Sequence, residues 1–323
     1  MSKPLKPAAL RAGDQIRVLS LASPVDEDHL RKGCDELSAL GFKPKFDLEK
    51  VLARDGFFAG PTGDRVASLR EALAEPATRA IFCARGGYGS NYLVDCLSAA
   101  PALRTAPKIV LGASDITSLQ IYLWQKFRWV TFYGPMVSMN FDRGAGAPHG
   151  YDRASLLSAL TEATRGWTLN LQGESLVSGI AEGILLGGCL TLVESTLGTP
   201  WEIDTAGAIL VLEDRGMKPY QVDRSLMHLK QAGKLKSVHG IILGDFPDSE
   251  VPAGTETVCD VVRRILLPLT DKQGGFPVIW GAPIGHTSRP MLTLPLGIRA
   301  RMTAAAGDSG STKLEILEPT CVA

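Results

Sequence analysis

The sequence predicts an α/β protein with two domains, the first of which is built on a mostly parallel sheet. Apolar runs alternate with helix-periodic segments through the amino-terminal half, and this pattern breaks down between about residues 144 and 176. The length of 323 residues is enough for two domains of ordinary size. Repeated strand–helix–strand units favour parallel strands that are covered by helices on both faces.

The first domain is expected to cover residues 1–150. Its strand candidates are the apolar runs 16–22, 42–47, 80–84, 108–112 and 129–133. Segment 26–40 is predicted to be a helix, because its apolar residues recur at helical spacing and Gly41 follows as a C-terminal cap. Ligands of parallel sheets gather at the carboxyl ends of the strands. The loops at Ser23 and at 85–90 therefore belong to the predicted ligand-binding edge.

Residues 151–176 lack sustained periodicity and are interpreted as an interdomain linker. The second domain, residues 177–323, is predicted to be mixed α+β. Its apolar runs are 184–186, 208–212, 240–243 and 278–280, its helices lie near 222–232 and 255–267, and short strand-like segments occupy 291–317. We expect the second helix to be stopped by Pro268, since proline cannot donate to the helical ladder.

Charge and cysteine content exclude several classes of protein. The chain has 34 Lys plus Arg and 34 Asp plus Glu, so no net field attracts nucleic acid or an anionic membrane. The amino terminus lacks the apolar core of a signal peptide and no later stretch reaches transmembrane length, so we expect a cytoplasmic protein. The six cysteines show no CxxC spacing, which indicates reduced thiols rather than a zinc site or disulfides.

A candidate nucleophile lies where the apolar run 108–111 meets the segment 112–117. Ser114 is expected on a sharp turn between a strand and a helix, where a hydrolase presents its nucleophile and where the first N–H groups of the helix point toward it. A plainer alternative is that Ser114 or Asp115 only caps the helix.

A serine nucleophile needs a base, and the chain has five histidines. Only His286 occupies a glycine-rich loop directly after a predicted strand, although a surface role is an open alternative. Strand 209–212 runs straight into Glu213 and Asp214, and a buried carboxylate needs a partner. One of these acids, Glu213 more than Asp214, is therefore a candidate to orient the histidine.

Several short motifs occur in one order along nearly the whole chain. They are Leu10–Val18, Ser23–Pro24, Arg85–Gly89, Gly112–Thr117, Tyr133–Met136, Gly187–Gly188, Leu212–Asp214, Pro219–Tyr220 with Asp223–Arg224, and Gly285–His286. This ordered set resembles the LD-carboxypeptidases, the serine peptidase family that includes muramoyltetrapeptide carboxypeptidase and the microcin C self-immunity peptidases.

The resemblance implies a Ser-His-Glu triad carried by Ser114, His286 and Glu213. It further implies a flavodoxin-like amino-terminal domain, a smaller carboxyl-terminal domain, an active site in the cleft between them, a homodimer and no cofactor. The implied reaction is the release of terminal D-alanine from murein tetrapeptides in cell-wall recycling, with no metal ion.

In that reaction the backbone N–H groups of Asp115 and of the Gly87–Tyr88 turn are candidates to bind the oxyanion. Arg85 is a candidate to match the free carboxylate of the substrate, with a structural salt bridge as the equal alternative.

Four alternatives accompany this hypothesis. Cys189, where the family commonly has Asn, could be the nucleophile, although its apolar neighbours favour a buried inert thiol. A dinucleotide-binding role is disfavoured because a GxGxxG pattern begun at Gly87 ends on Tyr92. A non-catalytic binder would share the site, and a peptidase or amidase that detoxifies a peptidyl-nucleotide is the rival within the family.

Overall fold

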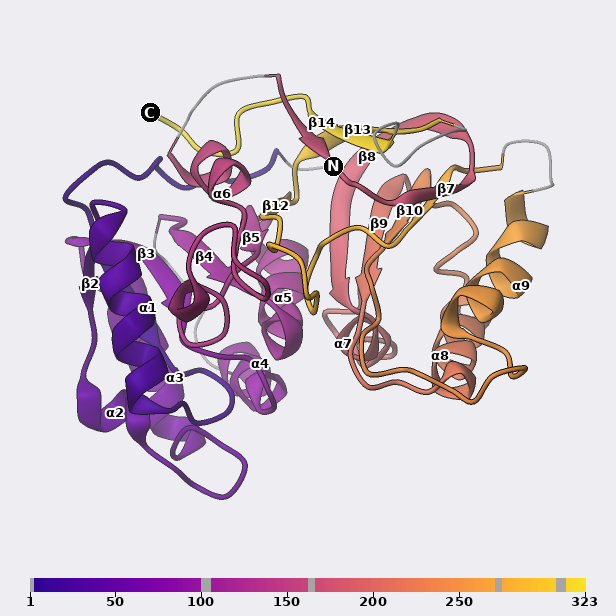
Figure 1. The fold of residues 1–323 in the computed structure, drawn as a ribbon. Coiled ribbons are helices and arrows are strands. Elements are labelled where there is room, and N and C mark those ends of the chain that lie inside the picture. Colours follow the sequence, from indigo (N-terminus) through magenta and orange to yellow (C-terminus); the bar gives the residue numbers. More distant parts are fainter. Residues whose placement is uncertain (1–2, 100–105, 162–165, 271–274, 306–311) are drawn as a thin grey trace. The chain divides into compact units, whose positions relative to one another are not determined.

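The computed structural model describes residues 3–99, 106–161, 166–270, 275–305 and 312–323. The chain divides into two compact units (Figure 1). Unit 1 comprises Met1–Ala163, Arg289–Leu296 and Pro319–Ala323, and unit 2 comprises Thr164–Ser288 and Gly297–Glu318. Among the described residues, no helix is long and apolar enough to cross a membrane. The predicted two-domain α/β class is confirmed.

Unit 1 is built on a six-stranded sheet of order β12-β5-β4-β3-β1-β2. Its strands are β1 (Gln15–Leu19), β2 (Lys43–Lys45), β3 (Thr78–Cys83), β4 (Ile109–Gly112), β5 (Thr131–Tyr133) and β12 (Leu294–Leu296). The first five pair in parallel, in the order of flavodoxin-like sheets, and β12 adds an antiparallel edge. All six residues of β3 except Arg79 are buried, as are all four of β4, which fits a sheet covered on both faces.

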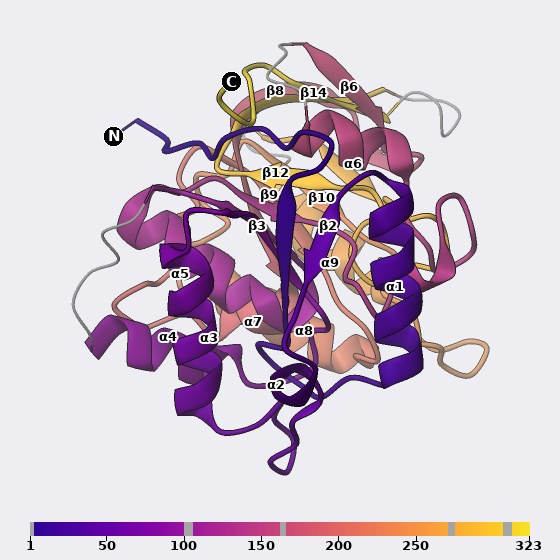
Figure 2. The same cartoon turned by 90° about the vertical axis from the view of Figure 1, so that its left-hand side faces the viewer.

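Helices cover both faces of this sheet. Figure 2 shows α1 on one side of the strands and α3, α4 and α5 on the other. The helical elements are α1 (Glu27–Ala39), α2 (Leu48–Leu52), α3 (Thr62–Ala74), α4 (Ser90–Ala99), η1 (Ser114–Ile116), α5 (Thr117–Phe127), η2 (Phe141–Arg143) and α6 (Arg153–Leu160). The predicted helix at 26–40 corresponds to α1. Asp26 caps it by accepting from the backbone N–H groups of Asp28 and His29, and Leu30, Cys34 and Leu37 are buried.

Unit 2 is built on an eight-stranded sheet of order β6-β14-β13-β8-β9-β10-β11-β7. Its strands are β6 (Trp167–Asn170), β7 (Glu174–Val177), β8 (Gly179–Cys189), β9 (Ala208–Glu213), β10 (Gly240–Leu243), β11 (Val278–Trp280), β13 (Arg299–Ala304) and β14 (Thr312–Ile316). Strands β8 to β11 are parallel and the others are antiparallel, which makes this unit mixed. Its helices are α7 (Leu190–Glu194), α8 (Pro219–Gln231) and α9 (Val258–Thr270).

Two local expectations fail. The segment 151–176, interpreted as a linker without regular structure, contains α6, β6 and part of β7. Its strands are short and pair with distant partners, so local periodicity could not reveal them. Helix α9 also continues through Pro268 to Thr270, because a proline close to the C-terminus removes only one backbone bond and few turns remain for it to disturb.

Candidate functional site

Ser114 lies on a strained turn between β4 and α5. Its φ is +59°, in the left-handed region that non-glycine residues rarely adopt. Its backbone N–H donates to the Tyr133 hydroxyl, with 3.1 Å between nitrogen and oxygen, and the residue is half-buried. A serine held at positive φ after a strand is the geometry of a nucleophile elbow.

The capping alternative is not supported for this helix. In the described part of the chain, the N-cap residues of η1 and α5 are Ala113 and Ile116, and neither gives its helix a hydrogen bond from its side chain. The Asp115 carboxylate instead accepts the backbone N–H of Ser90 at 2.7 Å, and the Ser90 hydroxyl donates to the Asp115 carbonyl. Asp115 is buried, and burial raises its pKa above 3.8, although the hydrogen bonds from Ser90 oppose this. Its side chain therefore fixes the start of α4 against the elbow.

Two adjacent glycines let the loop after β3 approach the elbow. A Cβ on Gly86 would lie 2.9 Å from the Ser114 Cβ and 3.2 Å from its Oγ. A Cβ on Gly87, whose φ is +102°, would lie 2.3 Å from the Ser23 Oγ. Any side chain at either position would therefore displace the serine or the loop that faces it.

The loop also fixes which predicted donors are available. The backbone N–H of Tyr88 donates to the Ser23 hydroxyl at 3.0 Å, and the Ser23 N–H donates to the Gly86 carbonyl at 3.1 Å. The Tyr88 N–H is therefore engaged and does not serve as an oxyanion donor in this arrangement, which leaves Gly87 in the predicted pair. Arg85 is exposed and donates to the Pro24 carbonyl at 3.2 Å.

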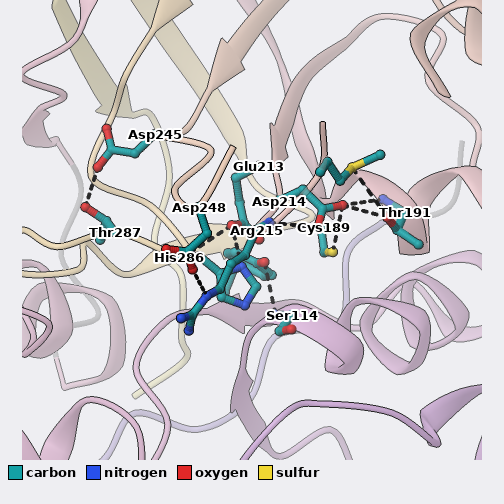
Figure 3. A network of polar contacts seen from close by, with 12 residues as sticks. Ser114, Cys189, Thr191, Glu213, Asp214, Arg215, Asp245, Asp248, His286 and Thr287 are labelled. Atoms are coloured by element: carbon teal, nitrogen blue, oxygen red, sulfur yellow. Dashed lines mark hydrogen bonds and ion pairs between the residues drawn. The ribbon is translucent and has the colours of Figure 1, made fainter. Parts of the chain in front are cut away.

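In unit 2, the predicted acid and base contact each other (Figure 3). Glu213 ends β9 and is fully buried, and His286 follows β11 in the loop 281–287. One carboxylate oxygen, Oε2, lies 2.9 Å from the His286 Nδ1 and accepts the His286 backbone N–H at 2.8 Å. The two bonds fix both the ring and its backbone.

Glycines again make this contact possible. Gly285, at φ +60°, has no room for a side chain, because its Cβ would lie 2.1 Å from the Glu213 carboxyl carbon. A Cβ on Gly244 would lie 2.6 Å from the Glu213 Cβ. The carboxylate is thus enclosed by backbone from two loops.

The charge of Glu213 determines the protonation of His286. Burial by itself would lower the pKa of His286, but the charge of Glu213 and its hydrogen bond outweigh burial. The pKa of His286 therefore lies above its ordinary value of 6.5, with Asp214 raising it further and Arg215 opposing. A protonated imidazole is stabilised at this position, as a general base requires when it accepts a proton.

Asp214 makes a separate set of contacts. Its Oδ2 accepts the backbone N–H of Thr191 at 2.9 Å, the Thr191 hydroxyl at 2.7 Å and the Cys189 thiol at 3.4 Å. Burial and the charges of Asp214 and Glu213 raise the pKa of the Cys189 thiol well above 9.0. A neutral thiol that donates to a carboxylate is a poor nucleophile, which favours the inert interpretation of Cys189.

The predicted site residues thus form two groups. Ser114, Asp115, Arg85, Gly87 and Tyr88 belong to unit 1, and Glu213 and His286 belong to unit 2. Sequence reasoning placed Ser23 at the ligand-binding edge and both Ser23 and Tyr133 in family motifs, but it did not predict their hydrogen bonds, which hold the facing loop and the elbow. Among the residues that the structure describes, no three His, Cys, Asp or Glu side chains form a metal site.

Comparison with known proteins gives two family models and several relatives. The model of the LD-carboxypeptidase N-terminal domain matches residues 16–134, and that of the C-terminal domain matches residues 182–302. A probable murein peptide carboxypeptidase of Bacillus subtilis is 38% identical over 305 residues, which cover 93% of this chain and 92% of that protein. The microcin C7 self-immunity protein MccF of Escherichia coli is 28% identical, over 92% and 93% of the two chains.

Solved structures agree with this result. The muramoyltetrapeptide carboxypeptidase of Oxalobacter formigenes superposes with a TM-score of 0.76 at 25% identity, over 94% of this chain and 99% of that one. MccF in complex with aspartyl sulfamoyl adenosine gives a TM-score of 0.83 at 25% identity, over 99% and 100%.

The fold and the two matched domains define a serine-type carboxypeptidase. The chain belongs to the LD-carboxypeptidase family.

Proposed function

We propose that this protein hydrolyses the L,D peptide bond of murein tetrapeptides and releases terminal D-alanine, with Ser114, His286 and Glu213 as its triad. The observation that carries the proposal is the contact between the buried Glu213 carboxylate and the His286 Nδ1, the acid–base pair of a triad. The strained Ser114 elbow supports it independently.

The mechanism follows from the hydrogen bonds of His286. Because Nδ1 donates to Glu213, the neutral ring presents Nε2 as its acceptor. Nε2 takes the proton of the Ser114 hydroxyl as the oxygen attacks the carbonyl carbon of the L-residue, and Glu213 stabilises the imidazolium that forms. Nε2 then passes this proton to the departing amine of D-alanine, and water repeats the sequence to release the peptide. The proposal requires the Ser114 hydroxyl of unit 1 to come within hydrogen-bond distance of the His286 Nε2 of unit 2 during catalysis.

The oxyanion donors are proposed to be backbone groups of unit 1. The N–H of Asp115 belongs to the first turn after the elbow, where N–H groups have no intrahelical acceptor. The N–H of Gly87 is the second candidate, since Gly86 and Gly87 bring this loop against Ser114 and Ser23. Both would face the developing negative charge.

A second substrate class has specific support. MccF relatives match over nearly the whole chain, and one of their structures contains an aspartyl sulfamoyl adenosine. An amidase that acts on a peptidyl-nucleotide would use the same triad. We favour the murein peptide because the Bacillus subtilis relative, at 38% identity, is named for it.

One assay separates these candidates. The purified protein is incubated with an L,D-linked murein tetrapeptide and, separately, with an aminoacyl sulfamoyl adenosine, and the released D-alanine or amino acid is quantified. We expect D-alanine release with kcat/KM at least tenfold higher than for the nucleotide. The reverse order would reassign the substrate. A protein that cleaves neither substrate and is not labelled by a fluorophosphonate would be a binder rather than an enzyme.

We further propose that the enzyme meets its substrate in the cytoplasm and acts as a homodimer without a cofactor. Fractionation of the native organism tests the location, and light scattering of the purified protein tests the dimer.

A further inference from the structure

Arg215 lies beside the catalytic pair in the loop after β9. It is separated from Glu213 by one residue, and its charge slightly lowers the pKa of His286, against the larger effect of Glu213. Figure 3 shows its side chain extending past Glu213 on the same side as His286. The guanidinium therefore places a positive charge beside the proposed triad.

The neighbouring loop orients this guanidinium. Its Nε donates to the Asp248 carboxylate, and the Gly216 N–H donates to the Pro247 carbonyl at 2.9 Å. Asp248 is held at φ +58°, and Phe246 in the same loop stacks on Trp280 with ring centroids 5.6 Å apart and planes 8° apart. The loop that aims Arg215 is thus packed rather than free.

Among the described residues, the two terminal nitrogens of Arg215 make no hydrogen bond. In the part of the chain that the structure describes, the bonds of this residue are its backbone N–H to Asp214 and its Nε to Asp248. The side chain is 56% exposed, so the guanidinium is open to a ligand. Its terminal nitrogens form the planar fork that binds a carboxylate through two parallel hydrogen bonds.

Reaction geometry indicates which carboxylate this is. The amine that leaves must lie within hydrogen-bond distance of the His286 Nε2, because that atom donates its proton. In a terminal amino acid the carboxylate carbon is only two bonds from this nitrogen. A cation that recognises the terminal carboxylate must therefore stand next to the histidine.

We propose that Arg215 binds the free terminal carboxylate of the substrate, and thereby restricts the enzyme to removing a single carboxyl-terminal amino acid. This inference rests on the proposed function. It moves the role from Arg85, which belongs to the other unit and donates to the Pro24 carbonyl, and for which the described residues provide no carboxylate partner. Asp248 is then a positioning residue.

The test compares an L,D-linked tetrapeptide that has a free carboxylate with its carboxyl-terminal amide. For Arg215→Gln we expect kcat/KM on the acid to fall about 10- to 100-fold, as for other lost charge-assisted hydrogen bonds, while the amide changes less than about twofold. Arg215→Lys keeps the charge but not the fork, and should retain an intermediate preference. Arg263→Gln, which removes an exposed guanidinium paired with Glu174 in the same unit, is the matched control and should retain the full preference.

A second readout comes from pH. Removal of the Arg215 charge should move the acidic limb of kcat/KM to higher pH, because this charge disfavours protonated His286. The inference would be overturned if Arg215→Gln kept the wild-type ratio of kcat/KM on the acid to kcat/KM on the amide. It would also be overturned if Arg85→Gln, and not Arg215→Gln, lost this ratio. Failure of the wild-type protein to cleave either peptide would instead refute the proposed function, and the inference with it.

Discussion

Glu213 and Asp214 are adjacent acids with different environments, which makes them a direct test of the site at the residue scale. Glu213 contacts His286, whereas Asp214 contacts Thr191 and Cys189, as expected for successive side chains at the end of a strand. Glu213→Gln should lower kcat by orders of magnitude, because an amide cannot stabilise the imidazolium. Asp214→Asn should mainly cost stability, about 1–3 kcal/mol, since it weakens the bonds of a buried acceptor.

Turnover and melting temperature of both variants decide this point. A large loss of activity confined to Asp214→Asn would move the acid by one residue and contradict the predicted motif alignment.

The raised pKa of His286 gives a prediction with a definite sign. Neutral imidazole is the active form, so kcat/KM should fall as pH drops, with a midpoint above 6.5. The same shift means that the pair stabilises the fold fully below pH 6.5 and loses this contribution as pH rises through the raised pKa.

In Glu213→Gln the His286 resonance should titrate at lower pH, because the carboxylate charge is gone. An NMR titration in which the wild-type pKa is 6.5 or lower would contradict the electrostatic account.

At the residue scale, sequence patterns could select Ser114, Glu213 and His286 because each follows an apolar run that predicts a buried strand. Sequence patterns could not show that Ser114 has a positive φ or that its backbone N–H donates to the Tyr133 hydroxyl, because both depend on packing between neighbouring strands. The engagement of the Tyr88 N–H by Ser23 joins loops 65 residues apart and has no local signal.

Glycine loops determine the site at the element scale. Gly285→Ala should lower kcat more than 100-fold, because a Cβ there would overlap the Glu213 carboxyl group and displace it from His286. Gly233, which follows α8, also has positive φ but nothing within 4 Å of its Cβ position. Gly233→Ala should therefore cost only about 1 kcal/mol of stability and leave turnover intact. Equal activity of the two variants would contradict the proposed role of Glu213.

The parallel strands of unit 1 lie within a few residues of the predicted runs. The inner strands β3, β4 and β5 were predictable because their residues are almost all buried, whereas β2 is a short strand with exposed lysines. The short strands β6 and β7 were not predictable, since each needs a partner that is far away in the sequence. Strand β12 lies within the predicted strand-like stretch 291–317, but its place in unit 1 was not predictable, because it pairs with β5 about 160 residues earlier in the chain.

At the scale of the whole molecule, the two units divide the proposed chemistry. Unit 1 carries the nucleophile on a strained elbow, and unit 2 carries the acid and base on two packed loops. Two crossings of the chain return residues 289–296 and 319–323 to unit 1, so that several segments link the units. No local pattern in the sequence indicates such returns.

Turnover of Ser114→Ala tests the central claim most directly. The substitution removes one hydroxyl from a half-buried residue, so the melting temperature should stay close to that of the wild-type protein. Release of D-alanine from an L,D-linked tetrapeptide should fall by at least three orders of magnitude, because no other group would attack the carbonyl. A folded Ser114→Ala protein that keeps even a tenth of wild-type turnover, or a matched Cys189→Ala protein that loses it, would contradict the account.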